Sequence, residues 1–220
     1  MKKDLHIKKL SIQTPSPELI PSILKENGIE YNPIDTLNWA DAFPYLPSVK
    51  FGIAHNSECI LLHYIVEEKS VRAVGGHDRD HMWEDSCVEF FCAPGAEGDD
   101  RYYNLETNCI GHLYACIGSS RSPREFLPDQ CYEGVKRWAS IGNEPFEEKM
   151  EKTKWELALV IPASTYYLHG LKTFNGARLR GNFYKCGEFL SDVHYVTWSP
   201  IGEPKPDYHC PKWFGDLFFE

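Results

Sequence analysis

Tryptophans beside charged residues offer the clearest chemistry in this sequence. Trp83 lies in the run His81–Asp85 (HMWED), and Trp198 ends an apolar run that is followed by prolines. An indole combines a broad apolar face with one N–H donor. A sugar ring presents the complementary surfaces, a face of C–H groups and a rim of hydroxyls. Trp83 and Trp198 are therefore predicted to stack against sugar.

Planar polar side chains recur along three predicted strands, in segments 86–92, 102–108 and 177–184. Because side chains of a strand alternate between its two faces, each segment has one apolar face and one polar face. The polar faces carry amide, carboxyl and guanidinium groups, which make paired hydrogen bonds. A solvated sheet face is the alternative interpretation. The candidate hydrogen-bonding residues for a sugar are Glu89, Asn104, Glu106, Arg180 and Asn182.

Three other chemistries are alternatives to sugar binding. Glu89 and Glu106 are the candidate pair for a glycoside hydrolase, which needs two carboxyl groups roughly 5–10 Å apart. His77 and His81 have a spacing that suits metal ligands on a helix, but the run GGHDRDHMW is typical of a loop. A serine or cysteine nucleophile has no supporting elbow motif. We therefore predict no catalytic residue and no metal ligand, with hydrolysis as the alternative.

The elements that must position these residues are short strands. Apolar and β-branched runs are separated by Gly, Pro, Asp and Asn clusters, and no amphipathic helical pattern alternates with them. This pattern indicates an all-β fold, an antiparallel β-sandwich of the jelly-roll type. The predicted strands are Val49–Ile53, Cys59–Val66, Ser86–Cys92, Tyr102–Cys109, Leu113–Ile117, Trp155–Ile161, Arg178–Tyr184 and His194–Trp198.

The first part of the chain has a different character. Residues 1–47 are predicted to form an irregular N-terminal lead packed on the sandwich, with a short helix from Glu18 to Glu26 that ends at the Asn27-Gly28 signal. No linker divides the sequence, so residues 1–220 are expected to form a single domain.

Charge and cysteine usage limit the partners and the compartment. A formal net charge of −9 argues against nucleic acids and anionic membranes, because both require a basic surface. The eight cysteines include no C-x-x-C pair and lie mostly in apolar runs, so we expect reduced, buried thiols. The N-terminal run MKKDLHIKKL lacks the apolar segment of a secretory signal. We expect a cytoplasmic location, although a trimmed exported form would look the same.

Several ordered motifs resemble the family 9 carbohydrate-binding modules, within a β-sandwich superfamily that includes DOMON domains. The motifs are MWEDSCVEFF, YYNLETN, GNFYKC, HYVTWSPI and PDYHCPKWFG, and the resemblance spans roughly Trp39 to Glu220. Modules of this family hold a terminal sugar between two tryptophans while a partner domain cuts the polymer. The resemblance therefore implies non-catalytic binding of a mono- or oligosaccharide during carbohydrate breakdown, with a partner glycoside hydrolase acting in trans.

The resemblance also implies roles for single residues. Trp83 matches the first clamp residue, Glu89 the acidic residue of W-x-x-D-S-x-E, Trp198 the second clamp and Asn182 a late-strand polar residue. Fully extended, Trp83 and Glu89 would lie about 20 Å apart, so residues 83–85 must fold back as a loop. An arginine is expected within the strand that follows Gly98, but Arg101 lies only at the start of that strand. Its replacements could be Arg121, Arg124, Arg178 or Arg180.

Modules of this family often bind structural calcium, so the resemblance raises calcium as a cofactor. Calcium takes six to eight oxygen ligands, and the chain has no EF-hand loop. We interpret the acidic loops as solvated charge and predict no cofactor, with calcium as the alternative. The candidate oxygen donors are Asp78, Asp80, Glu84 and Asp85, and separately Asp99 and Asp100.

Overall fold

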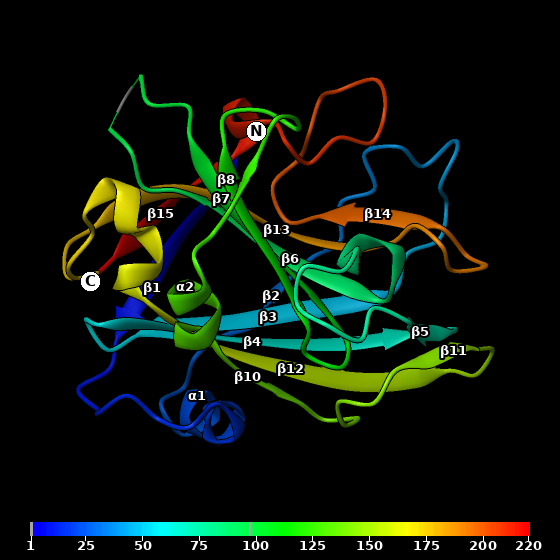
Figure 1. Ribbon diagram of the computed structural model, residues 1–220, viewed down its shortest axis with the longest axis horizontal. Helices are drawn as coiled ribbons and strands as arrows, with labels where there is room; N and C mark the ends of the chain where they lie inside the picture. The colour runs from blue at the N-terminus through cyan, green and yellow to red at the C-terminus, as the bar shows by residue number, and fades with distance from the viewer. Residues whose placement is uncertain (1, 97) are drawn as a thin grey trace.

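The first layer of the fold is a sheet of long antiparallel strands. A computed structural model describes residues 2–96 and 98–220, and in it this layer runs in the order β10-β12-β4-β3 (Figure 1). Strand β4 pairs with β12 over ten residues, from Cys59 opposite Pro162 to Glu68 opposite Thr153. The strands are β3 (Ser48–His55), β4 (Cys59–Glu68), β10 (Lys136–Ala139) and β12 (Thr153–Pro162), with the short β2 (Asn32–Pro33) on β3.

The second layer carries the motifs singled out in the sequence. Its order is β15-β13-β6-β7-β8-β9, and β14 pairs with the second half of β13. The strands are β6 (Cys87–Ala93), β7 (Tyr102–Asn108), β8 (Leu113–Gly118), β9 (Glu125–Phe126), β13 (Arg178–Gly187), β14 (His194–Thr197) and β15 (Gly215–Phe219). All these pairings are antiparallel, as the sequence predicts.

Strand β1 (Asp4–Lys9) joins the two layers and corrects two expectations. It pairs with β15 through residues 4–7 and with β3 through Lys8 and Lys9, and both pairings are parallel. The sheet is thus mixed and the N-terminal lead is not wholly irregular. Leu5 and Ile7 alternate toward the core, but the charged residues on either side of them hid this short strand in the sequence.

The main hydrophobic core lies between the layers and makes the fold a β-sandwich. Alternate residues of β6 and β7 face it, among them Val88, Phe90 and Leu105, so the predicted two-residue alternation is confirmed. Trp155 is fully buried in this core, and its indole N–H donates to Glu68 Oε1 at 2.6 Å.

Both outer faces of the sandwich are partly covered. On the first layer, the predicted N-terminal helix is present as η1 (Pro17–Leu19) and α1 (Ile20–Glu26), and α1 buries Ile20 and Leu24 against β4 and β12. On the second layer, the C-terminal segment brings Tyr208 and Phe214 against Phe91 and Tyr184. The polar face predicted for β6, β7 and β13 is therefore buried around a second aromatic core.

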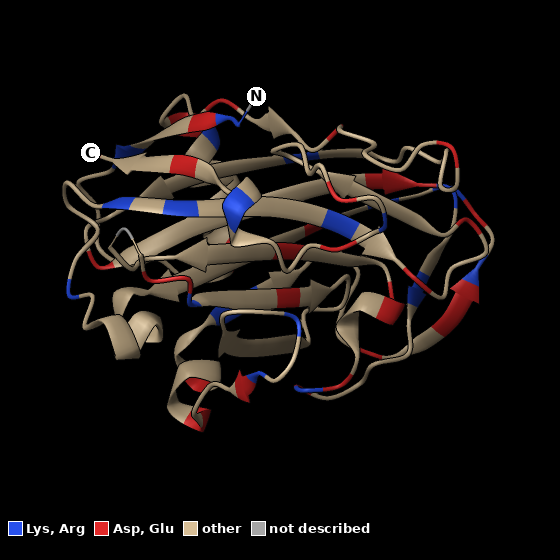
Figure 2. Ribbon diagram, turned by 90° about the horizontal axis from the view of Figure 1, so that it is seen from above, with Lys and Arg blue, Asp and Glu red and all other residues tan. Residues whose placement is uncertain are grey.

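The remaining elements lie at the ends of the sandwich. They are the β5–β11 pair (Val71–Ala73 and Phe146–Lys149), η2 (Met82–Glu84), α2 (Asp129–Gly134), η3 (Ala163–His169) and η4 (Pro211–Trp213). Acidic and basic residues are interspersed along the ribbon (Figure 2). Among the described residues, no helix has the length and apolarity needed to cross a bilayer. All eight cysteines are free, and seven of them are buried, as expected from the sequence.

Candidate functional site

A pocket of about 230 Å³ opens on the outer face of the second layer. The turn before β6, four strands and three loops contribute its walls. It contains aromatic rings, four carboxyl groups and two guanidinium groups. The lining residues are Trp83, Glu89, Glu106, Tyr114, Arg121, Arg124, Glu188, Tyr195, Pro206, Asp207, Tyr208 and His209.

Trp83 reaches this pocket because the chain folds back just before β6. Residues 82–84 form the single turn η2, and the buried Asp85 carboxylate holds the turn by accepting bonds from the Val74 and Gly75 amides at 2.9 Å. Arg72 and Asn108 also donate to this carboxylate. The fold-back that the sequence requires is therefore present, and Trp83 and Glu89 line one pocket.

The floor of the pocket holds two facing carboxyl groups. Glu89 on β6 lies directly opposite Glu106 on β7, and each residue is only 3% exposed. Burial raises the pKa of Glu89 well above its ordinary value and raises the pKa of Glu106 to about 7. A protonated carboxyl group both donates and accepts hydrogen bonds, so this floor is matched to hydroxyl groups.

Asn104 supports the floor from below through a chain of hydrogen bonds. Its amide nitrogen donates to Glu106 Oε1 at 2.7 Å, and its oxygen accepts from Arg124 Nε and Nη2 at 2.9 and 2.6 Å. The guanidinium of Arg124 also stacks on Tyr102, 4.3 Å from the ring centroid. Asn104, predicted to contact a ligand, is fully buried and orients Glu106 instead.

The rim of the pocket joins segments that are far apart in the chain. Arg121 donates to Asp207 Oδ1 and to the Pro206 carbonyl, both at 3.2 Å. On the opposite wall, burial raises the pKa of Glu188, while a hydrogen bond with Tyr195 opposes the shift. Burial lowers the pKa of His209 to about 3, so its imidazole is neutral.

Besides Asn104, three residues predicted from the sequence lie outside this pocket, and Trp198 is the main correction. It is 2% exposed in the core between the layers, where its ring packs edge-on against Phe51 and Phe183. A Cβ atom at Gly215 would lie 2.6 Å from its ring, so the indole fills its space completely. Trp198 is not an exposed stacking platform.

Asn182 and Arg180, the other two residues, form hydrogen bonds with the backbone. Asn182 is buried, its amide oxygen accepts bonds from the Phe183 and Ser199 amides, and its amide nitrogen donates to the Ser199 carbonyl. Arg180 donates to the Asp99 carbonyl, at the end of β13 that pairs with β15. Neither side chain lines the pocket.

Two aromatic residues of the pocket, Tyr114 and Tyr195, are not among the predicted site residues. The alternation of side chains along their strands is a weak sequence signal for both. Tyr195 lies one residue before Val196, and the alternation of β14 puts Val196 and Trp198 in the core and Tyr195 on the pocket side. Tyr114 follows from the same rule on β8. Asp207 and His209 have no such signal, because they lie in a loop without a repeating pattern.

Three of the six carboxylates named as candidate calcium ligands are engaged by other groups. The Asp78 carboxylate is held by Arg137 through both oxygens, and the Asp85 carboxylate is filled by Arg72, Asn108 and two amides. Asp99 is paired with Arg101 and His169. Calcium requires six to eight oxygen ligands, and these carboxylates face cationic and N–H donors instead.

The arrangement as a whole suits a small polyhydroxylated ligand. Trp83 and the tyrosines offer apolar faces, and the carboxyl and guanidinium groups offer planar hydrogen-bonding edges.

Comparisons with known proteins agree with this fold. The sequence profile of carbohydrate-binding family 9 matches residues 18–219. A candidate carbohydrate-binding protein from Bacteroides uniformis ATCC 8492 is 48% identical over the full length of both chains, with a TM-score of 0.96. None of the curated proteins matches the chain in sequence.

Two more distant structures share the fold. They are of a family 9 carbohydrate-binding module from Caldicellulosiruptor kristjanssonii, in complex with cellotriose and with glucose, and each is 11% identical to this chain. Their TM-scores are 0.66 and 0.64, and the matches cover 99% of this chain and 94% and 96% of theirs. At this identity the likeness is one of fold.

Proposed function

Because the chain belongs to carbohydrate-binding family 9, we propose that it binds a mono- or oligosaccharide without cleaving it, in the pocket beside Trp83. One observation carries the proposal. A partly exposed indole and two facing carboxyl groups line the same pocket, so that an apolar surface and a polar floor meet at one small site. The complexes of the distant family 9 module with glucose and cellotriose support a sugar as the ligand.

Trp83 is the stacking platform in this proposal, and a tyrosine takes the place of the second tryptophan. The His81 ring covers one face of the indole, stacked at 4.4 Å between centroids, and Tyr114 meets it edge-on at 5.0 Å. Tyr195 is half-buried on the pocket wall and is the second aromatic surface. Glu89 and Glu106 bond the sugar hydroxyls from below.

The size of the pocket favours the end of a sugar chain over its middle. Pockets for drug-sized molecules measure about 300–1,000 Å³, and this pocket, at about 230 Å³, is smaller. One sugar unit is the ligand that such a volume suits. Any further units would extend past the rim formed by Arg121 and Asp207.

Hydrolysis by Glu89 and Glu106 is the alternative, and one observation favours it: both carboxyl groups line the pocket. A glycosidase, however, needs one of the two ionised as nucleophile or base. Here burial shifts both toward the neutral form, and no cationic side chain bonds directly to either carboxyl group among the described contacts. Binding is therefore the function that we propose.

Isothermal titration calorimetry with glucose, cellotriose and other neutral sugars tests the proposal. We expect one saturable site, and Trp83→Ala should weaken it roughly ten- to a hundredfold, because a stacking surface contributes about 1–3 kcal/mol. The matched control is Trp213→Ala, since Trp213 is also half-buried in the second aromatic core but does not line the pocket. Unchanged binding in Trp83→Ala, or no saturable binding to any sugar, would overturn the proposal.

We place this binding in the breakdown of poly- or oligosaccharides, with a separate glycoside hydrolase as the partner in trans. Eight free cysteines support a reducing compartment, and we propose the cytoplasm. Co-purification of the native protein with a hydrolase from its source cells tests the partner directly.

A further inference from the structure

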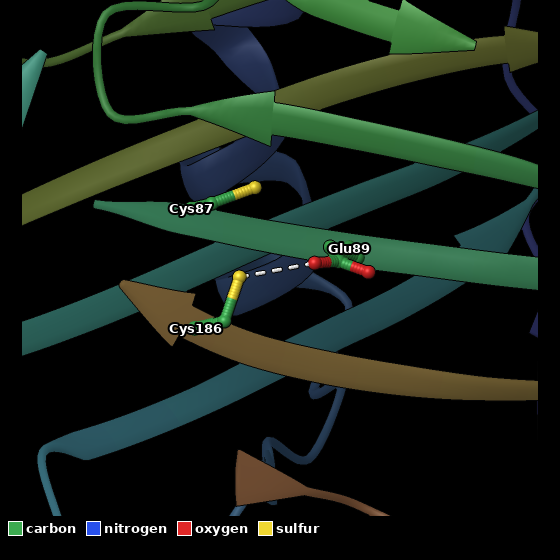
Figure 3. A group of neighbouring side chains, drawn as sticks. All are labelled: Cys87, Glu89 and Cys186. Carbon is green, nitrogen blue, oxygen red and sulfur yellow. Dashed lines mark hydrogen bonds between the residues drawn. The ribbon is translucent and has the colours of Figure 1, made fainter. Parts of the chain in front are cut away.

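A group of two thiols and one carboxyl lies beneath the pocket floor. Cys87 and Glu89 are two residues apart on β6, so they share a face, and Cys186 on β13 is the direct cross-strand neighbour of Cys87 (Figure 3). The Cys186 thiol donates to Glu89 Oε1 at 3.0 Å. One ligand atom from each residue lies within 4.8 Å of the other two. Among the described residues, no other three His, Cys, Asp or Glu side chains come this close.

The distances between these three ligand atoms span the range that a tetrahedral metal ion requires. With metal–sulfur bonds of about 2.3 Å and metal–oxygen bonds of about 2.1 Å, ligand atoms on one zinc ion lie about 3.6–3.8 Å apart. Here one separation is 3.0 Å and none exceeds 4.8 Å. Side-chain rotations on two rigid, paired strands are enough to close this difference.

Among the contacts of the described residues, no cationic side chain bonds to any of these three groups. All are buried, and burial raises the pKa of Cys87 to about 12 and raises those of Cys186 and Glu89 well above their ordinary values. A divalent cation would bind these groups in their deprotonated forms, so metal binding would release their protons to solvent.

We propose that Cys87, Cys186 and Glu89 form a binding site for a thiophilic divalent cation of the zinc class. Two sulfur ligands select zinc and similar ions over calcium and magnesium, which prefer oxygen alone. The ion enters from the sugar pocket, because Glu89 lines that pocket. It takes Glu89 Oε1, the oxygen that faces Cys186, and the second oxygen points away from Cys186 (Figure 3). The site does not depend on the proposed function, since the ion needs no sugar.

Cobalt(II) titration of the reduced, metal-free protein, without sugar, tests this site. We expect one equivalent of cobalt to bind with a thiolate-to-metal charge-transfer absorption, which zinc then displaces. Cys87→Ser and Cys186→Ser should abolish that absorption. The matched control is Cys92→Ser, because Cys92 lies on the same strand, is also buried and faces the opposite core.

A second variant keeps the test decisive if a serine variant fails to fold. Glu89→Gln retains both thiols, so it should keep the charge-transfer band but weaken cobalt binding at least tenfold. The proposal is overturned if the wild type gives no charge-transfer band with stoichiometric cobalt, or if the band persists in folded Cys186→Ser. It is also overturned if thiol titration in denaturant counts six instead of eight and a Cys87–Cys186 disulfide is found by mass spectrometry.

Discussion

Glu89 and Glu106 are direct cross-strand neighbours on β6 and β7, and both carboxyl groups reach one pocket although each residue is almost fully buried. Paired carboxyl groups at a sugar site are typical of both binding proteins and hydrolases. What separates the two functions is whether one carboxyl is ionised when the sugar is bound.

Aryl glycosides and plant oligosaccharides should therefore remain intact when incubated with the protein. Burial shifts both carboxyl groups toward the neutral form, so neither is held fully ionised near neutral pH as a nucleophile or base. Release of the chromophore or of reducing ends, measured against a boiled sample, checks this. Turnover that disappears in Glu89→Gln or Glu106→Gln would establish the hydrolase alternative instead.

The three tryptophans discussed above should differ sharply in their effect on stability. Trp155→Ala and Trp198→Ala each remove a ring from the core between the layers and should lower the free energy of unfolding by about 3–5 kcal/mol. Trp83→Ala removes a partly exposed ring and should lower it by about 1 kcal/mol or less. Urea denaturation measures all three. If Trp83→Ala is as unstable as Trp155→Ala, then Trp83 is a core residue and cannot be the platform.

Arg124→Ala should weaken sugar binding about tenfold, even without a direct bond from Arg124 to the sugar. Its guanidinium holds Asn104, and Asn104 holds the Glu106 carboxyl, so the substitution frees Glu106 to move. Arg124→Lys should not restore affinity, because one ammonium cannot make both bonds. The control is Arg178→Ala, an exposed arginine at the far end of β13. Equal losses of affinity in Arg124→Ala and Arg178→Ala would mean that net charge, not this hydrogen-bond chain, supports binding.

A buried ion pair between the layers makes a separate prediction for stability. Lys185 lies 2.8 Å from Glu68 Oε2, and both side chains are fully buried. Lys185→Met leaves the Glu68 charge without a partner and should lower the free energy of unfolding by about 3–5 kcal/mol. Adding Glu68→Gln removes that charge, so the double variant should be more stable than Lys185→Met. Denaturation of both variants, analysed as a double-mutant cycle, checks the coupling.

Stability should fall as the pH drops below about 6.5 because of His194. Burial and the neighbouring Lys185 lower the pKa of His194 well below its ordinary value, and Lys185 donates to its Nε2 at 2.7 Å. Below about pH 6.5 the unfolded chain takes up a proton that the folded chain cannot, at about 1.4 kcal/mol per pH unit. Above that pH, His194 is neutral in both the folded and the unfolded chain, and its contribution to the free energy of unfolding is fully present.

Urea titrations at pH 7.5, 6.5 and 5.5 measure this slope in the wild type and in His194→Gln. Other groups also titrate in this range, so the difference between the two proteins isolates the effect of His194. The variant should show a shallower loss of stability, since glutamine accepts from Lys185 without titrating. Parallel curves would mean that His194 takes up its proton in the folded state.

The sequence by itself determined the strands and the alternation of their side chains. Eight predicted strands are present, and Trp155 is in the core. These features are local, because the two-residue period of a strand tells which side chains share a face. The cluster of charges around Trp83 likewise marked a residue that is not fully buried.

Only the tertiary structure decided which face becomes a site and what lines it. The period cannot say that the polar face of β6, β7 and β13 is covered by the C-terminal segment, because for β6 and β7 that contact joins residues more than a hundred positions apart. For the same reason the two-residue period did not exclude Trp198 as a stacking platform for sugar. In the structure Val196 and Trp198 face the core, and Tyr195 faces the pocket. A side chain's partners depend on which distant segment packs against it, and one strand's sequence does not contain that information.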